Sequence, residues 1–314
     1  MPRRAVIDVG TNSVKVLVAD VEGRIVTPLW ETSEQTRLGR GFYEDHRLQP
    51  EPIAATAAAV ARFAEAARGR GAGSVRVVAT SAARDAVNRD ELLGAIQAAS
   101  GLATEVISGG TEAEWAFAGV CSAPGLAEQR LLVLDVGGGS TEFILGTRGQ
   151  IGFRGSFPLG SVRVSERLRP GDAPSGADLA SCRAWVRSLL GELVAPDLRR
   201  AFAVQGKPER VLGVGGSSAL LALVKHACPE FDRELVESTC FPRAELSALV
   251  ERLWSLPLAE RRLLPGLPPE RADVILTGSV IYEAVLEVFD LPELGVSTRG
   301  LRFAALTAPW PTGP

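Results

Sequence analysis

Short apolar runs and longer helical patterns alternate along most of this chain. Runs of apolar or β-branched residues predict strands at residues 5–7, 14–18, 75–79, 103–107, 131–134, 142–145 and 210–214. Apolar spacings of three and four residues predict helices over residues 53–68, 90–99, 176–193, 217–226, 243–254 and 272–289. Because strands that alternate with helices favour a sheet with helices packed on its faces, the pattern predicts an α/β fold.

A six-residue pattern occurs twice. DVGTNS at residues 8–13 recurs as DVGGGS at residues 135–140, and each copy lies between two apolar runs. Each copy therefore predicts a strand, a tight polar turn and a returning strand. We interpret the two hairpins as the openings of two duplicated domains that flank a cleft. The predicted domain I covers residues 1–123, with residues 294–314 packing back on it, and domain II covers residues 124–293.

Composition and charge narrow the class of protein. Hydrophobic residues make up 46% of the 314 residues, charged residues make up 23%, and the net charge is −3. This balance excludes general disorder and does not favour a nucleic-acid binder, which carries a basic patch. No run of about 18 uncharged apolar residues predicts a membrane span. Asp8 interrupts the first apolar run, so no secretory signal is predicted and the expected location is the cytoplasm.

Cysteine and histidine exclude several kinds of site. The four cysteines form no C-x-x-C pair, and His46 and His226 are the two histidines of the sequence. Zinc-ribbon, thioredoxin-like and histidine-rich metal sites are therefore excluded. The chemistry must depend mainly on carboxylates, hydroxyls, backbone amides and arginine.

The second hairpin, DVGGGSTE at residues 135–142, is the richest in candidate binding groups. Glycines in a turn leave backbone N–H groups open to an anion, and hydroxyls add donors. A carboxylate at each end of the turn fits a hard cation such as Mg²⁺ that bridges protein and phosphate. The alternative is an ordinary glycine-rich hairpin with a solvated acid at each end. The predicted phosphate-binding residues are Gly137, Gly138, Gly139, Ser140 and Thr141, and the predicted metal ligands are Asp135 and Glu142.

Two further turns carry similar groups. The first hairpin has hydrogen-bonding side chains in place of glycines, and two such hairpins across a cleft would hold a phosphoanhydride chain from both sides. GVGGSS at residues 213–218 joins a predicted strand to a helix, whose N-terminus suits another phosphate or a nucleotide; glycine is also common in such turns for structural reasons alone. A P-loop is excluded, because no G-x-x-x-x-G-K-[ST] pattern occurs. The predicted phosphate-binding residues of these turns are Gly10, Thr11, Asn12, Ser13, Gly215, Gly216 and Ser217.

Glu112 and Arg84 are candidate reactive side chains. Thr111 and Glu114 have capping-box spacing at a predicted helix start, and Glu112 is not needed for that box. Glu112 either faces the cleft as a base for a water molecule or serves as a first-turn acid that stabilises the helix dipole. Arg84 follows the strand at residues 75–79 and either clamps a phosphate or lies on a helix surface.

Taken together, these segments resemble the exopolyphosphatase/guanosine pentaphosphate phosphohydrolase (Ppx/GppA) family over essentially the whole chain. The likeness is carried, in matching order, by residues 5–13, 79–84, 107–120, 134–142, 213–223 and 266–285. It implies two actin-like, ribonuclease H-like domains of the sugar kinase, Hsp70 and actin superfamily, in the short two-domain form. Many relatives carry arginine at the position of Glu114 and an acid at that of Thr111, which puts the substrate preference in question more than catalysis.

The resemblance also implies roles for single residues. Glu112 would activate the attacking water, and Arg84 and the hairpins would grip phosphates. Asp135 and Glu142 would bind Mg²⁺ or another divalent cation, with Asp8 as a further predicted ligand.

The activity that the resemblance implies is release of orthophosphate from the end of inorganic polyphosphate by in-line attack of water. Hydrolysis of guanosine pentaphosphate (pppGpp) to ppGpp is the first alternative. A sugar kinase or actin-like ATPase is the second, and a non-catalytic sensor of polyphosphate or alarmone is the third. A homodimer is expected from the family likeness, and neither a nucleic-acid nor a membrane partner is expected.

Overall fold

The computed structural model describes residues 1–310, and the chain divides into two units. The first unit holds residues 1–122 and the segment that begins at Arg299, and the second unit holds residues 123–298. No helix in the described part of the chain is long and apolar enough to cross a membrane.

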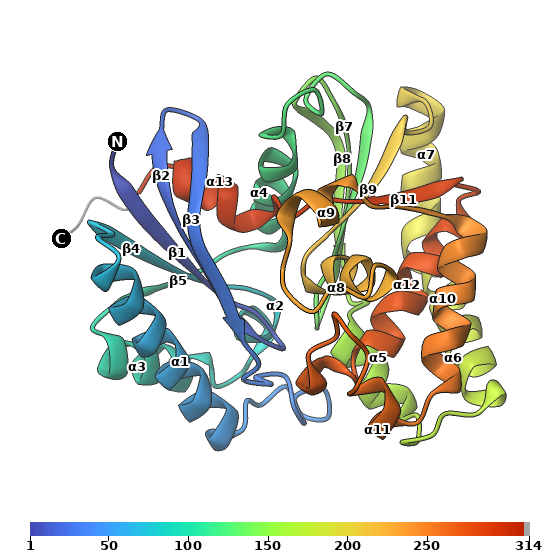
Figure 1. Ribbon diagram of the computed structural model, residues 1–314, viewed down its shortest axis with the longest axis horizontal. Coiled ribbons are helices and arrows are strands. Elements are labelled where there is room, and N and C mark those ends of the chain that lie inside the picture. The colour runs from blue at the N-terminus through green and yellow to red at the C-terminus, as the bar shows by residue number, and fades with distance from the viewer. Residues whose placement is uncertain (311–314) are drawn as a thin grey trace. The chain divides into compact units, whose positions relative to one another are not determined.

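The first unit is built on a five-stranded sheet (Figure 1). Its order is β3 (Ile25–Glu34), β2 (Val14–Glu22), β1 (Arg3–Val9), β4 (Ser74–Ala79) and β5 (Thr104–Val106). The first three strands pair antiparallel with one another, whereas β1, β4 and β5 run parallel. The carboxyl ends of the three parallel strands therefore lie at one edge of the sheet.

Helices cover both faces of this sheet. On one face lie α1 (Pro50–Gly69) and α3 (Arg89–Ser100), and on the other lie α4 (Gly109–Cys121) and α13 (Leu301–Thr307); the short α2 (Ser81–Asp85) follows β4. Ala5 and Ile7 of β1 join the core beneath α1, whereas Val6 between them joins the core beneath α13. Because successive side chains of a strand point to opposite faces, a strand covered on both faces is apolar throughout.

The second unit repeats this architecture in a six-stranded sheet. Its order is β8 (Gln150–Phe157), β7 (Thr141–Thr147), β6 (Leu131–Val136), β9 (Arg210–Val214), β11 (Glu293–Val296) and β10 (Cys240–Pro242). The first five strands reproduce the order and the directions of β3-β2-β1-β4-β5, with β6 in the place of β1. The predicted α/β class with two duplicated domains is confirmed.

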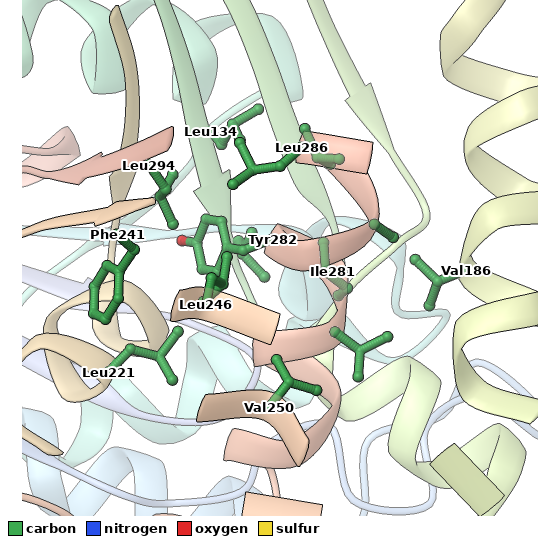
Figure 2. Packing of buried hydrophobic residues seen from close by; sticks show 14 of the residues in the cluster. Leu134, Val186, Leu221, Phe241, Leu246, Val250, Ile281, Tyr282, Leu286 and Leu294 are labelled. Carbon is green, nitrogen blue, oxygen red and sulfur yellow. The ribbon is translucent and has the colours of Figure 1, made fainter. Parts of the chain in front are cut away.

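The core of the second unit gathers around α12 (Ile275–Val288), which is buried from Ile275 to Leu286. Figure 2 shows Ile281, Tyr282 and Leu286 of this helix among the apolar side chains of the sheet and the neighbouring helices. A helix with apolar residues on most of its surface is stable when other elements surround most of it. The other helices of the unit are α5 (Ser161–Leu168), α6 (Gly176–Leu189), the π-helical turn η1 (Leu190–Val194), α7 (Ala195–Gln205), α8 (Gly216–Lys225), α9 (Arg233–Ser238), α10 (Arg243–Ser255), α11 (Leu258–Arg261) and the 3₁₀ turn η2 (Pro269–Arg271).

The predicted strands and long helices are present, but β3, β8, β10 and β11 were not predicted. β10 and β11 are short, with three and four residues. β3 and β8 are outer strands of the antiparallel part of their sheets. Neither has a clear apolar run: β3 contains Pro28, and β8 contains Gly152 and Gly155. The segment at residues 294–314, predicted to pack on domain I, is shared between the units, since β11 belongs to the second sheet and α13 packs in the first unit. Residues 311–314 of that prediction lie outside the described part of the chain.

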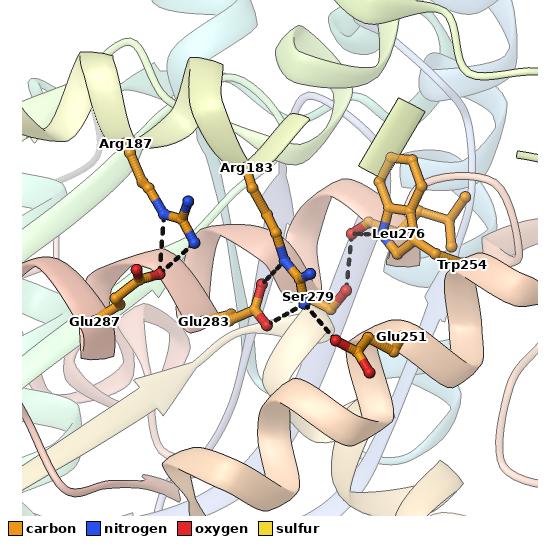
Figure 3. A network of polar contacts seen from close by, with 8 residues as sticks. All are labelled: Arg183, Arg187, Glu251, Trp254, Leu276, Ser279, Glu283 and Glu287. Atoms are coloured by element: carbon orange, nitrogen blue, oxygen red, sulfur yellow. Dashed lines mark hydrogen bonds and ion pairs between the residues drawn. The ribbon is translucent and has the colours of Figure 1, made fainter. Parts of the chain in front are cut away.

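Two arginines of α6 pair with two glutamates of α12, one helical turn apart (Figure 3). Nη2 of Arg183 lies 2.6 Å from Oε1 of Glu283, and Nη2 of Arg187 lies 2.6 Å from Oε2 of Glu287. The Glu283 side chain is 5% exposed and that of Glu287 is 48% exposed. The hydrogen bond between Arg183 and Glu283 raises the pKa of the Arg183 guanidinium. The two pairs thus differ in burial but little in geometry.

We expect Glu283→Gln to lower the free energy of unfolding by about 2 kcal/mol, because it leaves a half-buried guanidinium without its main counter-charge. Glu251, which lies 3.5 Å from Arg183, offsets part of the loss. Glu287→Gln, the matched control, should change stability by less than about 1 kcal/mol, since its pair is exposed to solvent. Urea unfolding of the full chain measures both values, and equal losses would contradict this ranking.

Candidate functional site

The polar turn of each unit follows the central strand of its sheet and closes with the same hydrogen bond. In the first unit the Gly10 amide donates to the Ser13 carbonyl at 3.1 Å. In the second unit the Gly137 amide donates to the Ser140 carbonyl at 2.9 Å. The two turns are equivalent local structures, as the repeated sequence pattern predicts.

The start of α5 holds the carbonyl groups of the second-unit turn. The Ser161 amide donates to the Gly137 carbonyl at 2.9 Å. Arg163 donates from its amide to the Gly138 carbonyl at 3.0 Å and from Nε to the Gly139 carbonyl at 2.9 Å. Because a planar peptide points its N–H away from its carbonyl, the amides that follow these three carbonyls face away from α5. This is the orientation that an anion-binding turn needs.

Asp135 and Glu142 lie directly opposite each other on β6 and β7, so their side chains share one face of the sheet. Glu142 is 1% exposed, and its Oε1 accepts hydrogen bonds from Ser140 at 2.9 Å and Ser156 at 2.7 Å. Asp135 is only half-buried. One carboxylate is thus held rigidly, and the other stands beside it within reach of solvent.

This pair fits a magnesium ion that takes its remaining ligands from water and substrate. Within residues 1–310 no three His, Cys, Asp or Glu side chains are grouped so as to hold a metal ion by themselves. Mg²⁺ usually binds through one or two carboxylates and keeps several waters or phosphate oxygens. Asp135 and Glu142 match that requirement.

The start of α8 lies against the same carboxylate. Gly215 has φ of +90°, and a Cβ at this residue would lie 2.8 Å from Oδ1 of Asp135. A Cβ at Gly216 would clash with Nη2 of Arg271. Glycine at both positions therefore allows the helix start to approach a carboxylate on one side and a guanidinium on the other. Ser217, the next residue, packs with its Oγ against Gly278 of α12.

Arg271 is a candidate binding residue that the sequence analysis missed. Burial lowers the pKa of its guanidinium, and Glu270 and Asp273 act in the opposite direction. A cation at a helix N-terminus is electrostatically unfavourable, because the helix dipole is positive there. An anion bound between them would relieve this repulsion, so this position is a candidate phosphate site. The one signal in the sequence is its place in residues 266–285, a segment of the family likeness.

The hydroxyls of the second-unit turn are engaged within the fold. The Thr141 hydroxyl donates to the Leu159 carbonyl, and Thr141 is fully buried. Ser140 donates to Glu142, as described above. The backbone amides of this turn are therefore better candidate anion donors than these two hydroxyls.

In the first unit, the loop after β3 holds the turn at residues 10–13. The Gly39 amide donates to the Thr11 carbonyl at 2.7 Å, and the Arg37 amide donates to the Asn12 carbonyl at 3.0 Å. Gln35 donates from Nε2 to Oδ1 of Asn12 at 3.1 Å, and Nδ2 of Asn12 is buried without a hydrogen-bond partner in the described chain. A buried donor without a partner costs about 1–3 kcal/mol, so this amide is poised for an incoming acceptor such as a phosphate oxygen.

Asp8 has a different neighbour from its counterpart in the second unit. Asp8 and Lys15 hold the register positions that Asp135 and Glu142 hold on β6 and β7. An ammonium group opposite a carboxylate weakens its attraction for a metal cation. Asp8 is therefore a weaker candidate ligand than Asp135 or Glu142.

Arg84 and Glu112 form an ion pair. Arg84 lies on α2 after β4 and Glu112 on α4 after β5, so the parallel strands bring both to one sheet edge. Nη1 of Arg84 donates to Oε2 of Glu112 at 2.9 Å, and Glu112 is 8% exposed. The predicted capping box at Thr111 is wrong, because α4 begins at Gly109 and the Ser108 side chain accepts from the Thr111 amide.

Comparisons with known proteins agree on one family. A model of the Ppx/GppA phosphatase family matches residues 16–307. Exopolyphosphatase 2 of Mycobacterium tuberculosis is 35% identical over 294 residues, which cover 90% of this chain and 89% of that protein. The crystal structure of an exopolyphosphatase from Cytophaga hutchinsonii is 26% identical, with a TM-score of 0.86 over 97% of this chain and 96% of that one. The Aquifex aeolicus Ppx/GppA family member is 27% identical, with a TM-score of 0.77 over 98% of this chain and 97% of its own.

Proposed function

This chain belongs to the Ppx/GppA phosphatase family and is a phosphoanhydride hydrolase, and we propose that it releases orthophosphate from the end of inorganic polyphosphate. One observation of the second unit carries the proposal. The turn at residues 137–140 joins the strands that carry Asp135 and Glu142, and Arg271 of η2 lies against Gly216, next to the residue that approaches Asp135. The turn and Arg271 are thus two candidate anion-binding elements beside one carboxylate pair. The likeness to a protein named exopolyphosphatase 2 supports polyphosphate as the substrate.

In the second unit, we assign phosphate binding to the turn amides and to the Gly215–Ser217 helix start. Asp135 and Glu142 would hold Mg²⁺, and this ion would supply positive charge to the oxygens of the phosphates. Arg271 would bind a further phosphate oxygen through its guanidinium. Amides, a guanidinium and a helix N-terminus favour a ligand with several anionic groups in a row.

In the first unit, we assign the proton transfer to Glu112. Its carboxylate takes a proton from the attacking water, the water oxygen bonds to the terminal phosphorus, and the P–O bond to the rest of the chain breaks. Arg84 holds Oε2 of Glu112 in place. We assign the acceptance of the water proton to the other oxygen, Oε1. The Asn12 amide and the other residues of the first turn would bind phosphate oxygens.

The test is phosphate release measured in parallel on long polyphosphate, tripolyphosphate, pppGpp and ATP, with Mg²⁺ present. We expect the highest kcat/KM on polyphosphate. Faster turnover of pppGpp would show that alarmone hydrolysis is the main activity. Binding without turnover on all four would indicate a sensor, and phosphate release from ATP alone would indicate an actin-like ATPase. A homodimer and a cytoplasmic location stay predictions, and light scattering tests the first.

A further inference from the structure

Arg261 is an arginine that is 2% exposed and lies at the end of α11. Its Nε donates to the Ala272 carbonyl at 2.9 Å, and its Nη1 donates to the Leu256 carbonyl. One buried guanidinium thus ties together the two ends of the segment that leads from α10 to α12.

This arrangement is costly for a group that serves stability alone. Burial lowers the pKa of Arg261, and Asp172 and Asp273 counteract that effect. Replacing a buried charge by an apolar side chain of similar volume is often neutral or stabilising, so a buried arginine is weak evidence for a purely stabilising role. A guanidinium has fixed donor geometry, however, and so can set the positions of two carbonyls at once.

The segment tied by Arg261 presents Arg271. The carbonyl that accepts from Arg261 Nε belongs to Ala272, the residue directly after Arg271. Arg271 in turn places its Nη2 against Gly216 at the start of α8, a helix of ten residues. Displacement of the Ala272 carbonyl therefore moves the backbone from which Arg271 reaches this site.

We propose that Arg261 is a positioning residue: by holding the Leu256 and Ala272 carbonyls, it sets the place of the Arg271 guanidinium beside Gly216 and thereby the affinity for the phosphate chain. The inference rests on the proposed function, because it takes Arg271 as a phosphate-binding residue. It predicts that changes at Arg261 act on substrate affinity through Arg271 and leave the chemical step nearly untouched.

The experiment compares four proteins: the parent, Arg261→Met, Arg271→Met and the double variant. Two quantities are measured for each, KM and kcat for phosphate release and the calorimetric Kd for tripolyphosphate. We expect Arg271→Met to raise KM and Kd about tenfold or more, since a charge-assisted contact is lost. Arg261→Met should raise both several-fold with kcat changed less than about twofold, and should add nothing when Arg271 is already methionine.

Independent, additive effects of the two substitutions would overturn the proposal, as would an unchanged Kd in a folded Arg261→Met protein. If Arg261→Met does not fold, Arg261→Lys takes its place in the same comparison. A Kd of Arg261→Lys equal to that of the parent overturns the proposal, and so does an effect on Kd that adds to the effect of Arg271→Met. A parent that binds tripolyphosphate but releases no phosphate would defeat the proposed function, while the Kd comparison would still decide the role of Arg261. A parent that does neither would defeat both.

Discussion

Glu112→Gln should reduce kcat for phosphate release by about 10²- to 10⁴-fold and leave the Kd for tripolyphosphate near that of the parent. The amide keeps the shape of the carboxylate and still accepts the hydrogen bond from Arg84, which lies 2.9 Å from Glu112 in the parent. It cannot take a proton from water, so the loss falls on the chemical step. Single-turnover phosphate release and calorimetric binding on the same samples measure the two effects separately.

Glu114→Gln is the matched control. Glu114 lies on the same helix two residues further along and is exposed to solvent. The Glu114→Gln substitution removes the same charge from the same region as Glu112→Gln, so general electrostatic effects appear equally in both variants. Parental activity in Glu112→Gln would assign the base to another residue, and equal losses in both variants would indicate that net charge decides the rate.

Asp135→Asn should lower kcat at fixed Mg²⁺ by about a hundredfold and raise the Mg²⁺ concentration needed for half-maximal activity by about 10- to 100-fold. Glu142 is anchored by two serine hydroxyls, so Asp135 is the carboxylate most open to a cation and to solvent. Loss of its charge halves the negative charge that the pair offers to the ion. A magnesium titration of phosphate release measures the shift, and EDTA should stop release by the parent.

Asp290→Asn serves as the control, because its side chain is 82% exposed and it lies in the same unit. Its magnesium dependence should equal that of the parent. Turnover that persists in EDTA, or an unchanged magnesium dependence in Asp135→Asn, would remove the metal role from Asp135 and with it the assigned pairing with Glu142.

Local features of the sequence were sufficient to predict most elements. The turns at residues 10–13 and 137–140 were predicted because glycine and short polar residues between apolar runs specify a tight turn within a few residues. Long helices such as α1 and α10 were predicted because the spacing of apolar residues repeats inside each helix. The edge strands β3 and β8 were missed. Each pairs with a single neighbouring strand and is partly exposed to solvent, so its hydrophobic pattern is weak.

The sequence by itself determined the duplication, the two polar turns and the set of carboxylates that carries the family likeness. Tertiary structure alone decided which of these groups act together. Arg84 pairs with Glu112, which lies 28 residues further along the chain. Arg271 contacts Gly216 of α8 from the 3₁₀ turn η2, which precedes α12. Such contacts depend on how strands pair and helices pack. Residues distant along the chain carry no shared local pattern, so the composition and spacing of each segment cannot reveal its partner.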